Sequence, residues 1–289
     1  MAICTLCPRQ CGVDRSERTG FCGMGEKPRV ARAALHFWEE PCISGTRGSG
    51  AVFFSGCTLR CAFCQNYEIS HLGQGREISV RRLADIFKTL EDQGAHNINL
   101  VTATPFARAV LDALDLYKPQ IPVVWNTGGY ETLETLRMLE GAVDVYLPDL
   151  KHVSSRLSKL CAAAPDYFET ASKAIPEMCR QTGKARYSED GMMLRGVIVR
   201  HLVLPGCTVD SCRALDFIAE KLPRGTPVSL MRQYTPSPHC TIPGLEKRVT
   251  DQEYARVLRH FEALGLSGFI QEKESADAVY TPPFDLTGV

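Results

Sequence analysis

Short apolar and polar blocks alternate along most of this 289-residue chain. Brief apolar runs predict strands at 51–54, 97–101, 121–125, 143–147, 194–204 and 227–231. Between these runs, apolar residues recur at helical spacing, which predicts helices near 79–94, 105–117, 131–140, 153–163, 166–181, 209–222 and 250–264. Strands joined by helices form parallel sheets, so the pattern predicts an α/β fold whose sheet is open or curled into part of a barrel.

Local signals at the helix ends support this pattern. Ser79 is suited to cap the helix that follows it, and Thr250 with Glu253 forms the sequence of a capping box. The segment 30–43 alternates imperfectly and ends near Pro41, so it is predicted to be an extended connector, and 268–270 is a last short apolar piece.

Composition limits the kinds of protein that this chain can be. With 44% hydrophobic and 23% charged residues, it can bury a large core. Lys plus Arg equals Asp plus Glu at 33 each, so the chain has no overall basic footprint for nucleic acid. The amino terminus does not resemble a signal peptide, and no apolar run is long enough to cross a bilayer. We expect a cytoplasmic protein without a membrane partner.

Thirteen cysteines is a high number for such a protein, and in a reducing compartment it indicates metal binding or catalysis. Cys57, Cys61 and Cys64 follow the strand 51–54 directly, with C-x3-C-x2-C spacing. Three thiolates on one loop can hold a four-iron cluster and leave one iron without a protein ligand. The alternatives are a zinc loop or a chance group of buried cysteines, but structural zinc almost always has four protein ligands. The spacing therefore favours an iron–sulfur cluster.

A second group of cysteines lies near the amino terminus, at Cys4, Cys7, Cys11 and Cys22. Their density fits either a tetrahedral zinc site or a second iron–sulfur cluster. Few apolar residues surround them, so a metal centre would serve as the core of this segment. We therefore expect residues 1–45 to be a cysteine-rich extension of a core domain at 46–289, and we interpret the six remaining cysteines as ordinary residues.

Unusual polar residues occur where the predicted strands end. These residues include Thr102 and Thr104, Asn126 and Thr127, and Asp149 and Lys151, together with His201 within the fifth strand and Gln233 after the sixth. In barrels, active residues gather where strands end and loops begin. The sequence therefore predicts one site that includes the loop of Cys57.

A C-x3-C-x2-C loop after the first strand of an alternating α/β chain resembles the radical S-adenosylmethionine superfamily. Within it, the chain is most similar to pyruvate formate-lyase activating enzymes and to relatives whose substrate is poorly defined. The likeness extends from about residue 46 to the end, and it rests on the cysteine loop and the stretches 125–130, 147–151 and 199–206. It implies a partial (β/α)6 barrel.

The resemblance also implies a cofactor set. Cys57, Cys61 and Cys64 would ligate a [4Fe–4S] cluster, whose fourth iron would take the amino and carboxylate groups of S-adenosylmethionine. One electron, from a low-potential donor such as flavodoxin or ferredoxin, would cleave the sulfonium to methionine and a 5′-deoxyadenosyl radical. Phe63 would lie near the adenine.

Further positions match cofactor contacts of the family. The turn from Thr102 to Thr104 stands where many members have a glycine-glycine-glutamate stretch that binds the methionine amino group, so its backbone carbonyls would serve. Asn126, Thr127 and Asp149 match a monovalent-cation site, with Asn126 in place of an acidic residue. Lys151 matches a residue that faces the methionine carboxylate, and His201 and Gln233 complete the expected set.

The resemblance therefore predicts a radical oxidoreductase that activates a partner protein by abstracting hydrogen from a glycine of a glycyl radical enzyme. Radical modification of a small molecule, peptide or nucleic acid is the alternative, and the near-neutral charge disfavours RNA. A non-catalytic iron–sulfur carrier is a third class.

Overall fold

A mixed, mainly parallel sheet forms the centre of the molecule in the computed structural model, which describes residues 3–271 and 281–289. Its order is β3-β1-β2-β4-β5-β6-β8-β7, and β2, β4, β5, β6 and β8 run parallel. The bounds are β1 Arg29–His36, β2 Ser49–Phe54, β3 Arg76–Glu77, β4 Ile98–Val101, β5 Val123–Thr127, β6 Val145–Pro148, β7 Arg186–Tyr187 and β8 Met193–Val197. Every residue of β2, β4, β5 and β6 is buried, as expected for strands covered on both faces.

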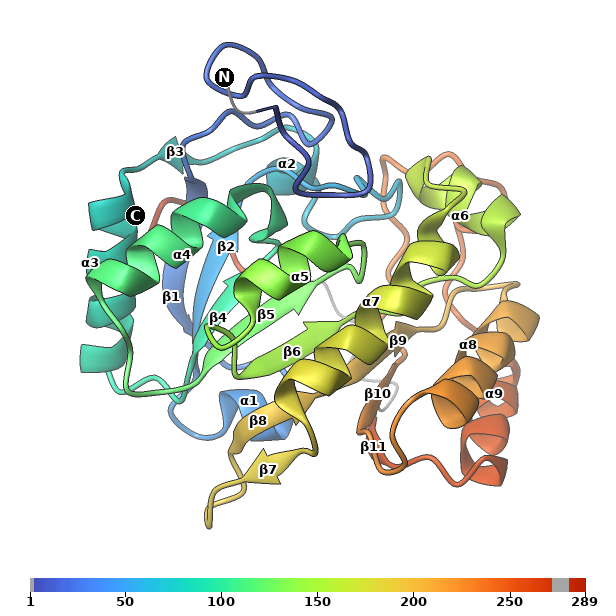
Figure 1. Ribbon diagram of the computed structural model, residues 1–289. Helices are drawn as coiled ribbons and strands as arrows, with labels where there is room; N and C mark the ends of the chain where they lie inside the picture. Colours follow the sequence, from blue (N-terminus) through green and yellow to red (C-terminus); the bar gives the residue numbers. More distant parts are fainter. Residues whose placement is uncertain (1–2, 272–280) are drawn as a thin grey trace.

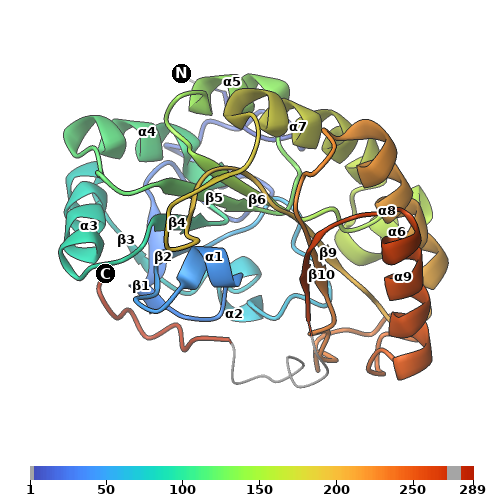
Figure 2. The ribbon, with the colours of Figure 1, turned by 90° about the horizontal axis from the view of Figure 1, so that it is seen from below.

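A smaller parallel sheet continues the first one. It contains β9 (Val199–Leu202), β10 (Val228–Met231) and β11 (Gly268–Ile270) in the order β11-β10-β9. The two sheets meet at a bridge between Asp149 and Arg200, where the Leu150 N–H donates to the Arg200 carbonyl at 2.8 Å. Seen from below, the strands form an arc that is open on one side (Figure 2). The prediction of a partial barrel is confirmed.

Helices cover the outer side of this arc (Figures 1 and 2). They are α3 Val80–Asp92, α4 Ala107–Leu116, α5 Leu133–Leu139, α6 Ser155–Ala162, α7 Tyr167–Thr182, α8 Thr208–Lys221 and α9 Asp251–Ala263. The connecting segments contain the short helices α1 Pro41–Ser44, α2 Tyr67–Ser70 and η1 Thr104–Phe106. The predicted caps are present: Ser79 accepts from the Arg82 N–H at 3.1 Å, and Thr250 with Glu253 forms a full capping box.

Two predicted strand boundaries were wrong. The run 194–204 is not one strand, because the chain changes sheets at its centre. The Ile198 N–H donates to Tyr146 in the large sheet, whereas the Val199 N–H donates to Pro227 in the small one. The segment 30–43 is more than a connector, because β1 pairs antiparallel with β2 from Val30 to His36. Both differences depend on partners that are distant in sequence.

One helix begins later than the sequence suggested, and this places a side chain in the site. The helix expected from 131 starts at Leu133, because the hydroxyl of Thr132 caps it by accepting from the Thr135 N–H at 3.2 Å. Glu131 therefore precedes the helix and is 2% exposed.

The carboxyl-terminal residues protect the edge of the large sheet. The Leu286 N–H donates to Ala31 at 3.0 Å, and the Ala33 N–H donates to Thr287 at 2.8 Å, so the tail runs beside β1. Covering an edge in this way reduces its tendency to pair with other chains.

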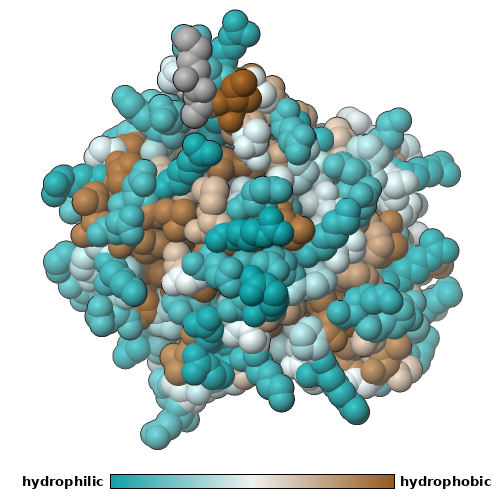
Figure 3. All heavy atoms as spheres, in the orientation of Figure 1, coloured by the Kyte–Doolittle hydropathy of each residue, from teal (hydrophilic) through white to brown (hydrophobic). Residues whose placement is uncertain are grey.

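The surface carries mainly hydrophilic residues on the face shown in Figure 3, with scattered hydrophobic ones. Within residues 3–271 and 281–289, no helix has both the length and the apolar character that a bilayer crossing demands.

Candidate active site

The three loop cysteines line a single cavity of about 250 Å³ at the carboxyl ends of the parallel strands. β2 delivers the loop to this position, and Cys61 is buried while Cys57 and Cys64 are partly buried. Burial raises the pKa of the Cys61 thiol, and Lys151 acts in the opposite direction. The thiols of Cys57 and Cys64 also interact electrostatically with that of Cys61, so the three sulfurs are neighbours.

The polar residues predicted from the strand ends meet at the same cavity. Its wall includes Thr102 after β4, Asn126 and Thr127 at the end of β5, Asp149 and Lys151 after β6, and Gln233 after β10. Phe63 lines it as well and is 7% exposed. With β2, which carries the cysteine loop, and β9, whose last residue Leu202 also lines the cavity, six strand ends supply one site, as the fold of parallel strands allows.

Among the residues predicted to contact the cofactor, Thr104 and His201 do not line the cavity. Thr104 instead donates to Glu131 Oε1 at 2.8 Å. His201 is buried, and its Nδ1 lies 2.6 Å from the carbonyl oxygen of Leu150. Burial lowers the pKa of His201, so its ring is neutral. Thr104 thus contacts the loop after β5, and His201 contacts the loop after β6.

Two glycines allow the loops to approach one another. A Cβ on Gly128 would lie 2.7 Å from the side chain of Leu59 in the cysteine loop. Gly129 has a positive φ of 75°, and a Cβ there would collide with the carbonyl oxygen of Asp149. The loop after β5 can therefore pack against both the cysteine loop and the loop after β6.

A buried guanidinium joins the ends of three elements beside the cavity. Arg200 Nε donates to Asp149 Oδ1 at 2.9 Å, and Nη1 donates to Glu39 Oε2 at 3.2 Å. A third bond goes to Asn126 Oδ1. The Asn126 amide in turn donates to Glu39 Oε1 at 3.0 Å. Arg200 therefore binds side-chain oxygens of two of the three residues, Asn126 and Asp149, that were expected from the resemblance to hold a monovalent cation.

Asp149 also pairs with Lys151, whose Nζ lies 2.6 Å from Oδ2. Burial acts to raise the pKa of Asp149, but Arg200 and Lys151 outweigh it and hold the pKa below its usual range. Burial likewise acts to lower the pKa of Lys151, but Asp149, Cys61 and Tyr167 together outweigh it and raise that pKa. Both groups are therefore charged, and Lys151 presents a fixed positive charge at the cavity wall.

Tyr167, the first residue of α7, holds the loop after β6 in place. Its hydroxyl accepts from the Lys151 N–H at 2.8 Å and lies 2.7 Å from the carbonyl oxygen of Asp149. The sequence offered no signal for Tyr167 or Glu131, and Glu39 could be noted only as a possible ligand in the segment after residue 30. Arg200 was recognisable only as a charged residue inside an apolar strand run.

Glu131 lies behind the cavity, with Oε1 accepting hydrogen bonds from the hydroxyls of Thr104 and Thr127. Its Oε2 is buried without a hydrogen-bond partner in the part of the chain that the structure describes. Burial raises the pKa of Glu131 to about 7, although the two threonine hydroxyls lower it. The carboxyl is therefore protonated in mildly acidic solution and ionised in basic solution.

This pKa predicts a pH-dependent stability. Because the folded pKa lies above the ordinary value, Glu131 favours the folded state below pH 4.5, and that contribution is lost as the pH rises through about 7. Between these two pH values, we expect the free energy of unfolding of the wild-type protein to fall by about 3 kcal/mol relative to that of Glu131→Gln. Urea unfolding at pH 5 and pH 8 measures the difference. The exposed neighbour substitution Glu134→Gln is the control, and equal pH slopes in wild type and Glu131→Gln would contradict the prediction.

The amino-terminal cysteines lie outside this cavity, in loops beside α2 (Figure 1). Burial is the largest cause that raises the pKa of the Cys7 thiol to about 12, and the thiols of Cys22, Cys4 and Cys11 contribute to the same shift. The four cysteines are thus brought together. Within residues 3–271 and 281–289, no three Cys, His, Asp or Glu side chains are arranged to hold a single metal ion.

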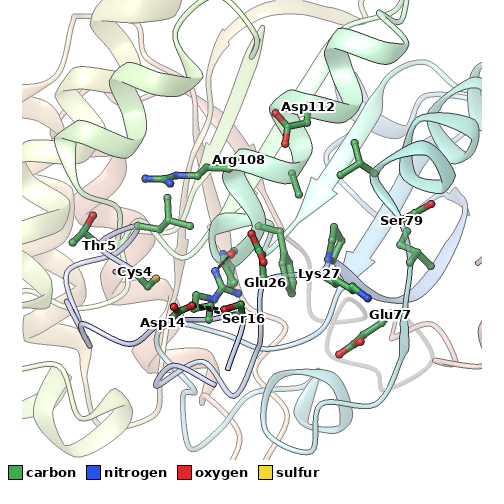
Figure 4. A pocket seen from close by; sticks show the side chains of 18 of the residues that line it. Cys4, Thr5, Asp14, Ser16, Glu26, Lys27, Glu77, Ser79, Arg108 and Asp112 are labelled. Carbon is green, nitrogen blue, oxygen red and sulfur yellow. Dashed lines mark hydrogen bonds between the residues drawn. The ribbon is translucent and has the colours of Figure 1, made fainter. Parts of the chain in front are cut away.

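A second and larger cavity, of about 840 Å³, lies between the amino-terminal loops and the beginnings of α3 and α4. Figure 4 shows Cys4 and Thr5 on one side of it and Arg108 with Asp112 from α4 on another. Acidic and basic side chains both line it, so its charge does not select one sign of ligand.

The fold and the first cavity define a class of protein. A partial barrel of parallel strands presents three thiols, which are suited to bind iron, together with charged residues that can hold a small polar cofactor. The three thiols converge on a cavity with room beside them, so the site fits an iron–sulfur cluster with one open iron. This combination is that of a cluster-dependent barrel enzyme.

Comparison with known proteins identifies the family. Residues 51–213 match the model of the Radical SAM superfamily, so the chain belongs to that superfamily. Its members are enzymes that use a [4Fe–4S] cluster and S-adenosylmethionine. The predicted family is confirmed.

Relatives and solved structures agree with this placement. An uncharacterized protein of Methanocaldococcus jannaschii is 29% identical over 96% of this chain and 76% of its own length. A radical SAM methyltransferase from Sphaerobacter thermophilus has a TM-score of 0.53 at 13% identity, over 77% of this chain and 66% of its own. SuiB from Streptococcus suis, bound to the precursor peptide SuiA, has a TM-score of 0.50 at 14% identity over 75% of this chain. The match spans 46% of the length of SuiB. At identities of 13% and 14%, these two structures support the fold alone.

Proposed function

We propose that this chain is a radical S-adenosylmethionine oxidoreductase that abstracts hydrogen from a residue of a protein or peptide, in the manner of glycyl radical activating enzymes. The observation that carries the proposal is the shared cavity, where Cys57, Cys61 and Cys64 meet the polar ends of the neighbouring strands. When bound, the [4Fe–4S] cluster and S-adenosylmethionine supply a 5′-deoxyadenosyl radical through one-electron cleavage of the sulfonium.

The protein's own residues would bind and orient the cofactor. Cys57, Cys61 and Cys64 would ligate the cluster, and the fixed charge of Lys151 would attract the methionine carboxylate. Thr102 adopts a left-handed backbone with a φ of 60°, which is uncommon for a residue with a Cβ and indicates a constrained turn at the cavity wall. The backbone of this turn would contact the methionine amino group.

The aromatic wall of the cavity would hold the adenine and exclude water. Phe63 packs edge-on against His152 and Tyr234, with ring centroids 6.2 Å and 6.0 Å away. Burial lowers the pKa of His152 to about 3, so its ring is neutral and adds no charge beside the reactive centre. A dry, low-charge wall on this side protects a reactive intermediate from side reactions.

The size of the cavity favours a substrate that enters from outside. Its volume of about 250 Å³ lies just below the usual range for small-molecule sites, and it must also admit the cofactors. Little room then remains for a separate small molecule. A single residue at the tip of a protein loop or peptide would occupy little volume, and the rest of the partner would stay outside.

The rim of the cavity carries an aromatic residue suited to such a partner. Trp38 lines the cavity, is 58% exposed and directly follows Phe37, which is 48% exposed. Exposed aromatics are enriched where proteins contact partners. The complex of SuiB with its precursor peptide shows that another protein of this fold binds a peptide.

We expect Trp38→Ala to raise the KM for a protein substrate about 30-fold, because loss of a central interface aromatic costs about 2 kcal/mol. The assay uses a candidate glycyl radical enzyme prepared with deuterated glycine and follows deuterium in 5′-deoxyadenosine by mass spectrometry. Leu116→Ala, an exposed position on α4, is the control.

The same assay tests the proposed substrate class. Deuterium transfer from the protein, together with a glycyl radical signal in electron paramagnetic resonance, would support activation of a partner. Transfer from a deuterated small metabolite, with none from protein or peptide, would contradict it.

A further inference from the structure

We propose that Cys4, Cys7, Cys11 and Cys22 hold a second iron–sulfur cluster, seated against the loop that carries the first. Nothing in this inference depends on the identity of the substrate.

The loops of the extension bring the four sulfurs to one place. The Cys4 N–H donates to the Val13 carbonyl at 3.0 Å, which sets Cys4 beside the segment that follows Cys11. A Cβ on Gly20 would lie 3.0 Å from Cys11 Sγ and 3.6 Å from Cys22 Sγ. A side chain at position 20 would therefore occupy the space beside these two sulfurs, and glycine keeps that space open.

The extension has little other means of holding its shape. Residues 3–28 contain no helix and no strand beyond the single bridge between Ile3 and Asp14. Within these residues, the buried hydrophobic side chains are those of Leu6, Cys7 and Met24. Segments with so small a core are commonly ordered by a bound metal centre.

The extension is in direct contact with the first cysteine loop. Gly56, which precedes Cys57, has a φ of 80°, and a Cβ there would lie 2.8 Å from the carbonyl oxygen of Cys22. Arg9 Nε donates to the Thr58 carbonyl at 2.8 Å. The backbone beside one cysteine group thus touches the backbone beside the other.

Arg9 also binds the extension to the end of α6. Its Nη2 donates to the Ala162 carbonyl at 2.7 Å, and its Nη1 donates to the Ala163 carbonyl at 2.6 Å. These are carbonyl groups at the end of α6, where a cation is favourable. The extension is therefore docked onto the barrel and is not a loosely tethered segment.

Zinc and a four-iron cluster require different arrangements of four thiolates. Four thiolates around one zinc lie about 2.3 Å from a common point. In a four-iron cluster each thiolate binds a different iron, so the sulfurs stand farther apart. In the described residues, neither the amino-terminal group nor the loop of Cys57 is arranged around a single ion. The amino-terminal group resembles the loop of Cys57 in this respect, and in that loop the superfamily holds a four-iron cluster.

The larger cavity gives the amino-terminal group a route to solvent. Cys4 is half-buried and lines this cavity, whose wall is completed by the beginnings of α3 and α4 (Figure 4). A soluble reductant can therefore reach this side of the extension without entering the first cavity.

Metal analysis of the full-length protein after anaerobic reconstitution tests the proposal. We expect about eight irons and about eight acid-labile sulfides per wild-type chain. Cys7→Ala and Cys61→Ala should each retain about four irons, and Cys212→Ala on α8 should retain about eight. About four irons with one zinc in the wild-type protein would overturn the second cluster, even if the variants fail to fold.

Electron paramagnetic resonance tests the contact between the two groups. In the reduced wild-type protein, the two paramagnetic centres should broaden each other's signals. A wild-type spectrum equal to the sum of the Cys7→Ala and Cys61→Ala spectra would overturn the contact. Failure of the proposed function looks different, since wild-type protein would then hold about eight irons and release no 5′-deoxyadenosine.

Discussion

Cys61→Ala should abolish the release of 5′-deoxyadenosine from S-adenosylmethionine by the reduced protein. Cys61 is the central cysteine of the loop and is buried beside the first cavity. Loss of a residue that only orients a metal ligand lowers metal affinity or activity by about 10–100-fold, so loss of a ligand itself should lower activity further. Chromatography of the products under anaerobic conditions measures the effect.

Cys212→Ala is the matched control, because this cysteine is only partly buried on the outer helix α8. It should retain wild-type cleavage. Turnover by Cys61→Ala at the wild-type rate would show that the loop does not hold the reactive cluster. Iron content measured on the same samples separates a lost cluster from a misfolded protein.

Arg200→Ala should destabilise the protein by about 3–5 kcal/mol, which is the usual cost of removing one partner from a buried ion pair. The side chains of Arg200, Glu39 and Asp149 are 12%, 12% and 16% exposed. Without the guanidinium, Glu39 and Asp149 keep their negative charges in a poorly hydrated place, and only Asp149 retains Lys151. Denaturant unfolding measures the loss.

A surface pair provides the comparison. Arg180 pairs with Glu140 at 2.9 Å and with Glu177 at 2.8 Å, but its own side chain is 56% exposed. Arg180→Ala should therefore cost no more than about 1 kcal/mol. Equal effects of the two substitutions would show that the Arg200 network does not stabilise the fold.

Adding Glu39→Gln to Arg200→Ala should recover part of the stability, because the second change removes one of the unpaired charges. Additive losses from the two substitutions would contradict this coupling.

Much of the architecture followed from local sequence patterns. Ser79 and Thr250 start helices as predicted, because a helix cap depends on residues within one turn. The break at Ile198 and the pairing of β1 could not be predicted in this way. They depend on hydrogen bonds to strands that lie far away along the chain, and no local pattern records those partners.

The site residues also fall into those that local sequence predicted and those that it did not. The spacing of Cys57, Cys61 and Cys64 was sufficient to indicate the cluster, because three ligands within eight residues need only one loop. Glu131 and Arg200 were not assigned roles. Their positions depend on how separate strands meet, and each resembled an ordinary charged residue in the sequence.

The sequence by itself therefore determined the family, the cysteine loop and the order of strands and helices, since these follow from spacing and hydrophobic period. Only the tertiary structure decided which strand ends share a cavity and that Arg200 binds Asn126 and Asp149. It also decided that the amino-terminal cysteines lie against the first loop. The reason is physical: a buried charge or a close backbone contact is stabilised by groups from distant parts of the chain, and these meet only when the sheet has formed.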